Sequence, residues 1–238
     1  MTADPPADGT ITRVELTCHR LRALRSFYGE HLGLPVRGDS HALHVSAGST
    51  EVVFRPAAEE ADGRYHLAFE VPESLVQEAA DWLAFRAPLL RCEGQVVIPS
   101  SQAWQAHSCY AFDPAGNSIE LIGRHRLPDP TVRPFGPQHI RRVSEVGVVV
   151  QDVGAFVARL AKRCGIAVFG RKSPEITFCG SELGMLVVVR DGRLWFPAGP
   201  LAEASPLAVH FQGPASASLR VPSRALRVSV GPAPPVLA

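Results

Sequence analysis

One order of elements recurs along the chain: a strand, a helix and then three short strands. Alternation over Ile11–Cys18 predicts a half-buried strand, and apolar residues spaced by three and four over residues 21–32 predict a helix with one apolar face. Strand-length segments follow at residues 35–37, 42–46 and 51–55, separated by turn sequences. Such an order, repeating about every 50–65 residues, indicates modules that pair to complete a shared core.

Three further modules follow the first. The second is predicted as a strand at 65–71, a helix at 73–85 and strands near 89–92, 108–112 and 118–122. The third has a strand at 143–150, a helix at 153–164 and three short strands, whereas the fourth begins with a strand at 207–211 and shows no helical period afterwards. A proline-rich stretch without periodicity predicts a division into a domain at 10–125, a linker at 126–139 and a second, degenerate domain at 140–238.

Charge and cysteine content exclude several classes of protein. The 24 Lys and Arg balance 23 Asp and Glu, so there is no excess positive charge to attract nucleic acid or a membrane surface. The apolar runs are of strand length, and the N-terminus lacks the pattern of a signal peptide. Five cysteines without a Cys-x-x-Cys pair fit reduced thiols. We therefore expect a cytoplasmic monomer or homodimer whose partner is a small molecule.

Three segments of the first half carry a family resemblance. Residues 22–35 contain Phe-Tyr followed by Leu-Gly-Leu-Pro, residues 65–71 form a strand that bears a histidine, and residues 112–121 combine an Asp-Pro-Ala-Gly-Asn turn with a strand that bears a glutamate. In this order they resemble the vicinal oxygen chelate superfamily, which includes glyoxalases, bleomycin-resistance proteins and extradiol dioxygenases. The resemblance implies an α+β fold of βαβββ modules paired into curled mixed sheets around a cavity. The missing helical period after the fourth module's first strand predicts that this last module is degenerate and lacks its helix.

The resemblance also implies chemistry at a metal. Members of this family use a divalent ion such as Fe, Mn, Ni or Zn to bind two vicinal oxygens of a substrate, as lyases, isomerases or ring-cleaving dioxygenases. His66 and Glu120 fall on the second and third ligand positions. The residues alone favour a solvent-facing histidine and an exposed glutamate, and the resemblance favours a role for both in the site. A histidine and a carboxylate that point into a cavity would form two-thirds of such a site.

The first ligand position departs from the family pattern because it holds Arg13, which stays protonated and cannot coordinate a cation. Glu15, on the same strand face, is then the candidate third metal ligand. Alternatively, Arg13 pairs with Glu120 and binds an anionic ligand in a metal-free pocket. Three functions are therefore possible. The first is a metalloenzyme with an incomplete triad of ligands, and the second is a metal-free sequestering or resistance-type protein. The third is a catalytically silent module that serves only interaction.

Two side chains near Glu120 are candidate catalytic residues with it. Tyr110 and His107 lie on the strand before the Asp-Pro turn, on opposite faces, so at most one of them faces the cavity. In the second half, Glu145 occupies the position equivalent to Arg13, but its partner position, Leu207, carries no ligand. The sequence therefore predicts no second metal site in that half.

Overall fold

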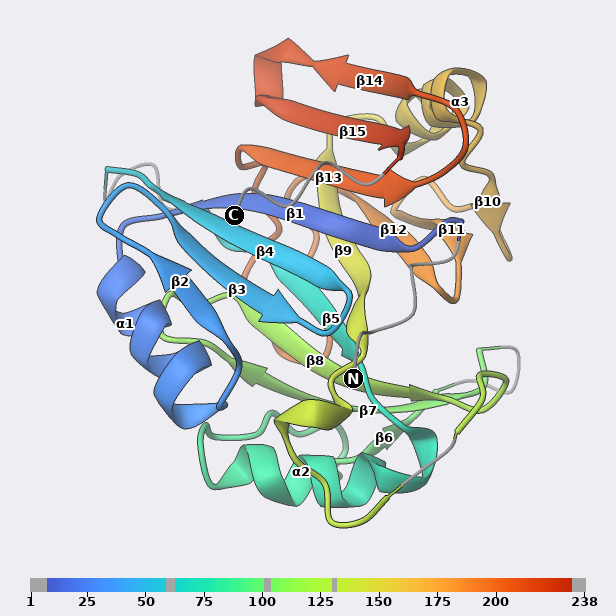
Figure 1. Ribbon diagram of the computed structural model, residues 1–238. Coiled ribbons are helices and arrows are strands. Elements are labelled where there is room, and N and C mark those ends of the chain that lie inside the picture. Colours follow the sequence, from blue (N-terminus) through green and yellow to red (C-terminus); the bar gives the residue numbers. More distant parts are fainter. Residues whose placement is uncertain (1–7, 59–62, 101–103, 130–131, 233–238) are drawn as a thin grey trace.

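The computed structural model describes residues 8–58, 63–100, 104–129 and 132–232 and contains two mixed β-sheets (Figure 1). The first sheet has the strand order β14-β15-β13-β1-β4-β3-β2. Its strands are β1 (Ile11–Cys18), β2 (Val36–Gly38), β3 (Leu43–Ala47), β4 (Thr50–Pro56), β13 (Leu207–Gln212), β14 (Ala217–Val221) and β15 (Leu226–Gly231).

The second sheet has the strand order β10-β11-β12-β9-β5-β8-β7-β6. Its strands are β5 (His66–Glu70), β6 (Ile98–Pro99), β7 (Ala106–Phe112), β8 (Ser118–Arg124), β9 (Arg142–Val150), β10 (Val168–Phe169), β11 (Ile176–Ser181) and β12 (Gly184–Arg190). The strand predicted near residues 89–92 makes only isolated pairings, so β6 is the second strand of its module.

The helices follow the predicted positions. They are α1 (Leu21–Arg25), which continues into the π-helical turn η1 (Ser26–His31), η3 (Glu73–Leu75), which leads into α2 (Val76–Ala84), and α3 (Val153–Cys164), besides the short turns η4 (Pro137–His139) and η5 (Pro222–Arg224). The bounds of α3 have a local cause. Asp152 accepts a hydrogen bond from the Ala155 amide, and Gly165 ends the helix in the left-handed conformation at φ 69°.

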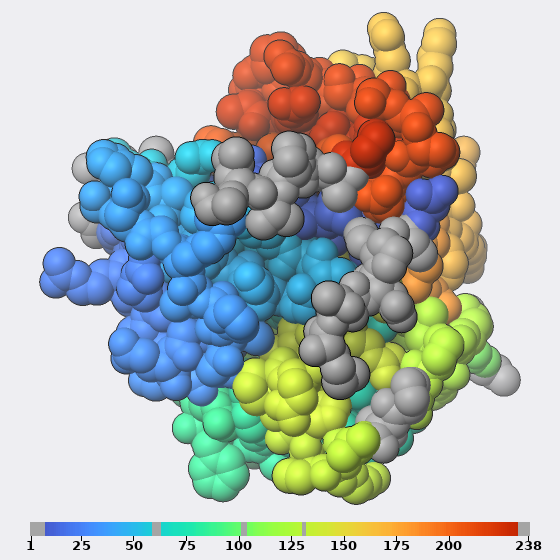
Figure 2. All heavy atoms as spheres, viewed as in Figure 1, coloured from blue at the N-terminus to red at the C-terminus, as the bar shows by residue number. Residues whose placement is uncertain are grey.

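Modules pair across the middle of the chain. Strand β1 of the first module pairs with β13 of the fourth, and β5 of the second module pairs with β9 of the third. Figure 2 shows the last module, in red, against the first, in blue, on one face of the molecule. Each sheet therefore takes one module from each predicted half. The division at 126–139 stays a prediction, and its residues 130–131, like residues 233–238 of the second half, lie outside the described residues.

The predicted fold class is confirmed. The first and last strands of every module are parallel neighbours, and residues 207–232 contain no α-helix. Helix α3 of the third module packs against β14 of the fourth. All five cysteines are free thiols. No helix in the described part of the chain is long and apolar enough to cross a membrane.

One core fills the space between the sheets. Leu67 and Phe69 of β5 belong to the same buried cluster as Val14 and Leu16 of β1. Because successive side chains of a strand point to opposite faces, His66 projects from the other face of the second sheet, away from this core. That outer face carries the site described next.

Candidate functional site

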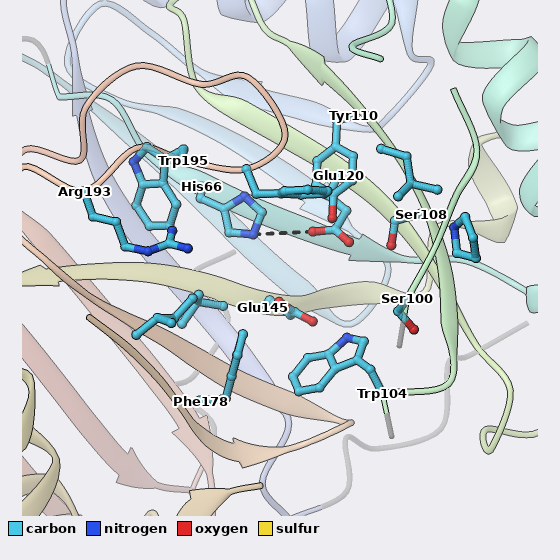
Figure 3. A pocket seen from close by; sticks show the side chains of 15 residues that line it. His66, Ser100, Trp104, Ser108, Tyr110, Glu120, Glu145, Phe178, Arg193 and Trp195 are labelled. Carbon is cyan, nitrogen blue, oxygen red and sulfur yellow. Dashed lines mark ion pairs between the residues drawn. The ribbon is translucent and has the colours of Figure 1, made fainter. Parts of the chain in front are cut away.

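A cavity of about 490 Å³ opens on the outer face of the second sheet (Figure 3). Strands β5, β7, β8 and β9 form its floor with four polar residues, His66, Ser108, Glu120 and Glu145. The walls are largely apolar and come from β11, the loop after β12 and the segment after β6; they include Phe178, Trp195, Phe196 and Trp104. An apolar chamber of this size with a few convergent polar groups is typical of a small-molecule site.

Strand register brings a histidine and two carboxylates together on this floor. Ala68 of β5 pairs with Glu120 of β8 on one side and with Glu145 of β9 on the other. Ala68 therefore lies between the two carboxylates, and His66 lies two residues along the same strand face. One ligand atom from each of His66, Glu120 and Glu145 lies within 4.8 Å of the others, and all three residues are buried.

Burial sets the protonation of this group. It lowers the pKa of His66, which Glu145 partly opposes, and favours the neutral imidazole that metals bind. It raises the pKa of Glu120, against hydrogen bonds from Ser108 and Tyr110 and the charge of Arg124. His66 Nε2 lies 3.5 Å from Glu120 Oε2. Its ring stacks on Trp195 with centroids 5.4 Å apart, which fixes the plane of the imidazole.

Arg124 is the charged neighbour of this group. It is the last residue of β8, its side chain is fully buried, and its Nη2 forms an ion pair with Glu145 Oε1. Burial raises the pKa of Glu145 and the Arg124 charge opposes that rise. The guanidinium also lies over the Trp104 ring, 5.4 Å from its centroid. Arg124 thus stabilises one ionised carboxylate while adding a positive charge beside the cluster.

The donor set fits a divalent metal. One imidazole nitrogen and two carboxylates suit Fe, Mn, Ni or Zn, and the described residues already hold the donor atoms close together. His66 Nδ1 is buried without a hydrogen-bond partner among the described residues, and Nε2 is the ring nitrogen that lies near Glu120. Val187 of β12 also lines the cavity, but its side chain has no atom that can bind a metal. A metal held by three protein donors would therefore keep coordination positions for substrate oxygens.

The structure places Glu15 and Arg13 elsewhere. Both lie on β1 of the first sheet, where Arg13 forms ion pairs with Glu15 and Glu51. Glu15 also pairs with Arg55, at 3.1 Å. The expected pairing of Arg13 with Glu120 is therefore corrected, and Glu15 does not reach His66. The physical reason is topological: the first module pairs with the fourth module and not with the second.

Of the two further candidates, the structure brings only Tyr110 to the cavity. Tyr110 pairs directly with Glu120 across β7 and β8, and burial raises its pKa well above the usual value, so the phenol stays protonated and can donate a hydrogen bond to that carboxylate. His107 lies on the other face of β7, beside Glu73 and His125. The alternation of the strand separates the two side chains, as the sequence predicts.

Sequence reasoning missed two residues of the site. The sequence places Glu145 at the first-strand position of its module but predicts no metal ligand there, because it does not show that the second module pairs with the third. Arg124 had a visible signal, since it lies four residues from Glu120 on the same strand and hence on the same face.

The chain is similar to known proteins of one fold. Residues 13–122 match the family model of a glyoxalase-like domain. A "putative dioxygenase" from Bacillus subtilis subsp. subtilis str. 168 superposes with a TM-score of 0.62 at 14% identity, over 97% of this chain and 87% of the other. Glyoxalase I from Zea mays superposes with a TM-score of 0.57 at 14% identity, over 93% and 91%. Comparison with curated proteins gives no match. The chain thus has the fold of these two proteins, and its residues 13–122 are similar to a glyoxalase-like domain.

Proposed function

We propose that this protein is a metal-dependent enzyme of the vicinal oxygen chelate type, a lyase, isomerase or ring-cleaving dioxygenase. The observation that carries the proposal is the buried group of His66, Glu120 and Glu145 on the floor of an apolar cavity. A charged pair of carboxylates is costly to bury without a cation or donor to balance it. These three residues would hold the metal, and the substrate would bind above them.

Bound there, a divalent metal would supply an electrophile that polarises two neighbouring oxygens of the substrate. The chain's own residues would do the rest. Tyr110 and Ser108 hold Glu120 in place by hydrogen bonds, and the stacked Trp195 fixes His66. Aromatic walls would exclude water around the apolar body of the substrate.

Arg193 supports an acidic or oxygen-rich substrate. It lies in the loop after β12, lines the cavity and donates a hydrogen bond from Nη1 to the Leu194 carbonyl at 2.9 Å. A guanidinium has five N–H donors in all, so most remain for an oxyanion. The cavity therefore combines one cationic side chain with an apolar chamber of about 490 Å³.

A second function, metal-free binding of a small molecule, is favoured by one observation. The ion pair of Arg124 with Glu145 already balances one carboxylate of the group. With that charge compensated, the same cavity would serve a sequestering or resistance-type protein that holds its ligand by apolar contact and by Arg193.

Metal titration separates the two functions. Chelator-treated protein would be titrated with Mn²⁺, Zn²⁺ and, without oxygen, Fe²⁺, comparing wild type with His66→Ala and with His41→Ala, an exposed histidine of the β2–β3 turn, as control. The metalloenzyme predicts that His66→Ala lowers the number of bound ions by one and that His41→Ala lowers it by none. Equal numbers in wild type and His66→Ala would overturn it.

Turnover then tests the reaction class. Metal-loaded protein would be assayed with catechol, for ring cleavage, and with the hemithioacetal of methylglyoxal and glutathione, for isomerisation. Both substrates present two vicinal oxygens. Turnover of either that is lost in His66→Ala supports the proposal. Stoichiometric binding of an aromatic acid by metal-free protein, without turnover of either substrate, would establish the second function instead.

A further inference from the structure

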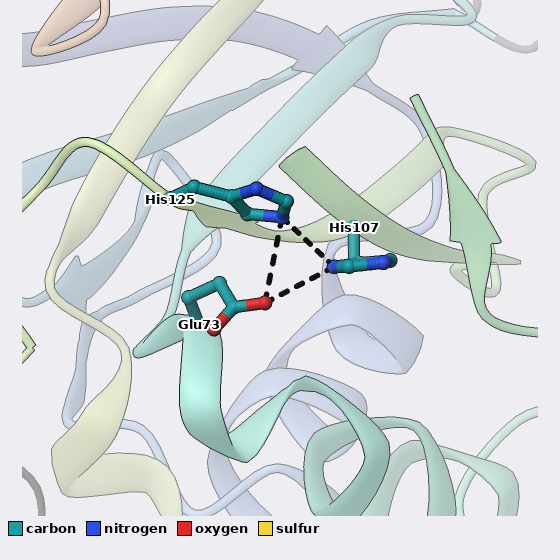
Figure 4. Close-up of side chains that lie close together, drawn as sticks. All are labelled: Glu73, His107 and His125. Carbon is teal, nitrogen blue, oxygen red and sulfur yellow. Dashed lines mark hydrogen bonds and ion pairs between the residues drawn. The ribbon is translucent and has the colours of Figure 1, made fainter. Parts of the chain in front are cut away.

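A second group of potential ligands consists of Glu73, His107 and His125, whose side chains lie close together (Figure 4). Glu73 comes from η3 at the start of the second helix, His107 from β7, and His125 from the residue after β8. Their side chains are 33%, 36% and 39% exposed. Whereas Ser108 and Tyr110 of β7 line the cavity, His107 points to the opposite face, so this group is separate from the proposed active site.

The three ligand atoms form a compact triangle. His107 Nδ1 lies 3.1 Å from Glu73 Oε1, His125 Nε2 lies 3.4 Å from the same oxygen, and the two nitrogens are 3.0 Å apart. A divalent zinc ion lies about 2.0–2.1 Å from its nitrogen and oxygen ligands, which places neighbouring ligands of a tetrahedron about 3.3–3.4 Å apart. The sides of the triangle therefore match one face of a tetrahedral site.

Hydrogen bonds alone leave one of the three contacts of this triangle unfavourable. An ionised carboxylate brings no proton, and each imidazole nitrogen carries at most one. If both nitrogens are protonated, both donate to Glu73 and their N–H groups oppose each other at 3.0 Å. If one nitrogen is protonated, its proton serves one of its two neighbours, and the bare nitrogen of the other ring faces the carboxylate lone pairs. A cation at the centre satisfies all three contacts at once.

We propose that Glu73, His107 and His125 bind a divalent transition metal ion, of which Zn²⁺ is the representative, with solvent completing the coordination. Two imidazoles and a carboxylate are a borderline donor set that selects such ions over Ca²⁺ and Mg²⁺. The ion would join η3, and through it the start of α2, to the neighbouring strands β7 and β8. The ion would stabilise the packing of the second helix against the sheet. This proposal does not depend on the proposed activity of the cavity.

The test is a count of bound Zn²⁺ in four variants at pH 7.5: wild type, His66→Ala, His107→Ala and the double variant. The proposal predicts that His107→Ala removes one ion both from wild type and from His66→Ala. Loss of an outer-shell partner alone weakens metal binding about 10- to 100-fold, so Glu73→Gln, which removes the anionic donor with little change of shape, weakens this site by more than about 100-fold. His41→Ala is the matched control.

Two readouts besides the count locate the ion. In the His66→Ala background, Co²⁺ gives the visible absorption of a tetrahedral site, and Zn²⁺ raises the melting temperature. Neither effect occurs once His107 is also replaced. Equal ion counts and equal melting shifts with and without His107→Ala would overturn the proposal. Loss of one ion on His66→Ala but none on His107→Ala would leave the cavity metal standing and refute this site alone.

Discussion

Replacing Glu120 by Gln should stabilise the metal-free protein while abolishing metal binding in the cavity. Glu120 is 4% exposed, and burial raises the pKa of its carboxyl above the usual value. The raised pKa means that the fold disfavours the carboxylate relative to the unfolded chain. Glutamine has nearly the same shape and no charge to bury, so the variant escapes this cost and loses the anionic donor.

The size of the expected stability gain follows from two opposing contributions to the free energy of burying Glu120. Burying one carboxylate costs several kcal/mol after relaxation, and each hydrogen bond to a charged group returns about 1.5–3 kcal/mol. Ser108 and Tyr110 supply two such bonds, and Arg124 adds a favourable charge. Since burial is the largest contribution, a small net cost remains. We expect Glu120→Gln to gain about 1–2 kcal/mol of unfolding free energy, or roughly 2–8 °C in melting temperature.

The gain in unfolding free energy of Glu120→Gln over wild type should increase with pH. A carboxyl with a raised pKa in the fold binds more protons folded than unfolded, so wild-type stability falls as pH rises from about 4.5 through the folded pKa. The advantage of Glu120→Gln is therefore near zero below pH 4.5 and complete above the folded pKa. Urea denaturation with chelator present at pH 5 and pH 8 measures it.

Glu145→Gln is the matched control, because burial raises the pKa of Glu145 as well, but its loss leaves the fully buried Arg124 without its ion-pair partner. Removing one partner of a buried ion pair costs about 3–5 kcal/mol, so Glu145→Gln should be less stable than Glu120→Gln. If Glu120→Gln destabilises the metal-free protein at pH 8, or if Glu145→Gln is at least as stable as Glu120→Gln, the electrostatic account of the site is refuted. Added Zn²⁺ should stabilise wild type more than either variant.

Three further outcomes follow from the structure. A Cβ at Gly147 would lie 2.5 Å from the Trp195 ring and 3.0 Å from His66 Cβ, so Gly147→Ala should cost about 1–3 kcal/mol in urea denaturation and alter tryptophan fluorescence. Tyr28→Phe removes a 3.0 Å hydrogen bond to buried Asp113 and should cost about 1.5–3 kcal/mol; unchanged stability would contradict this. Metal affinity of the cavity, measured by calorimetry, should rise with pH because both of its carboxyls have raised pKa values.

The fold could be predicted because each module has a recognisable local sequence pattern. Alternating strands, one apolar helical face and turn sequences are properties of short windows, and their recurrence identified four modules and the loss of the last helix. Which modules pair is not a local property. Nothing in a single window states that β1 meets β13 or that β5 meets β9, since these contacts join segments far apart in the chain.

The same limit explains the outcome at the site. His66 and Glu120 lie in one module, so their strands fix their neighbourhood, and both were predicted. The sequence predicts Glu15, on the first strand of the chain, as the third member, whereas the carboxylate that lies beside His66 and Glu120 is Glu145 of β9. Pairing of equivalent strands would have led to Glu145, because it holds the position of its module that Arg13 holds in the first.

The first sheet shows what a module pair looks like without such a site. There Arg13 pairs with Glu51, which also accepts hydrogen bonds from Arg37 and contacts His44 at 2.9 Å. Each carboxylate on this face thus has a guanidinium beside it, and a divalent ion would meet net repulsion. In the second sheet, Arg124 pairs with Glu145, and no ion pair with a guanidinium is seen for Glu120 within the described residues, so the group keeps a negative charge for a cation to balance. The first-strand position that holds Arg13 in the first sheet holds Glu145 in the second, and this difference in charge distinguishes the self-compensated sheet from the one in which we propose a metal.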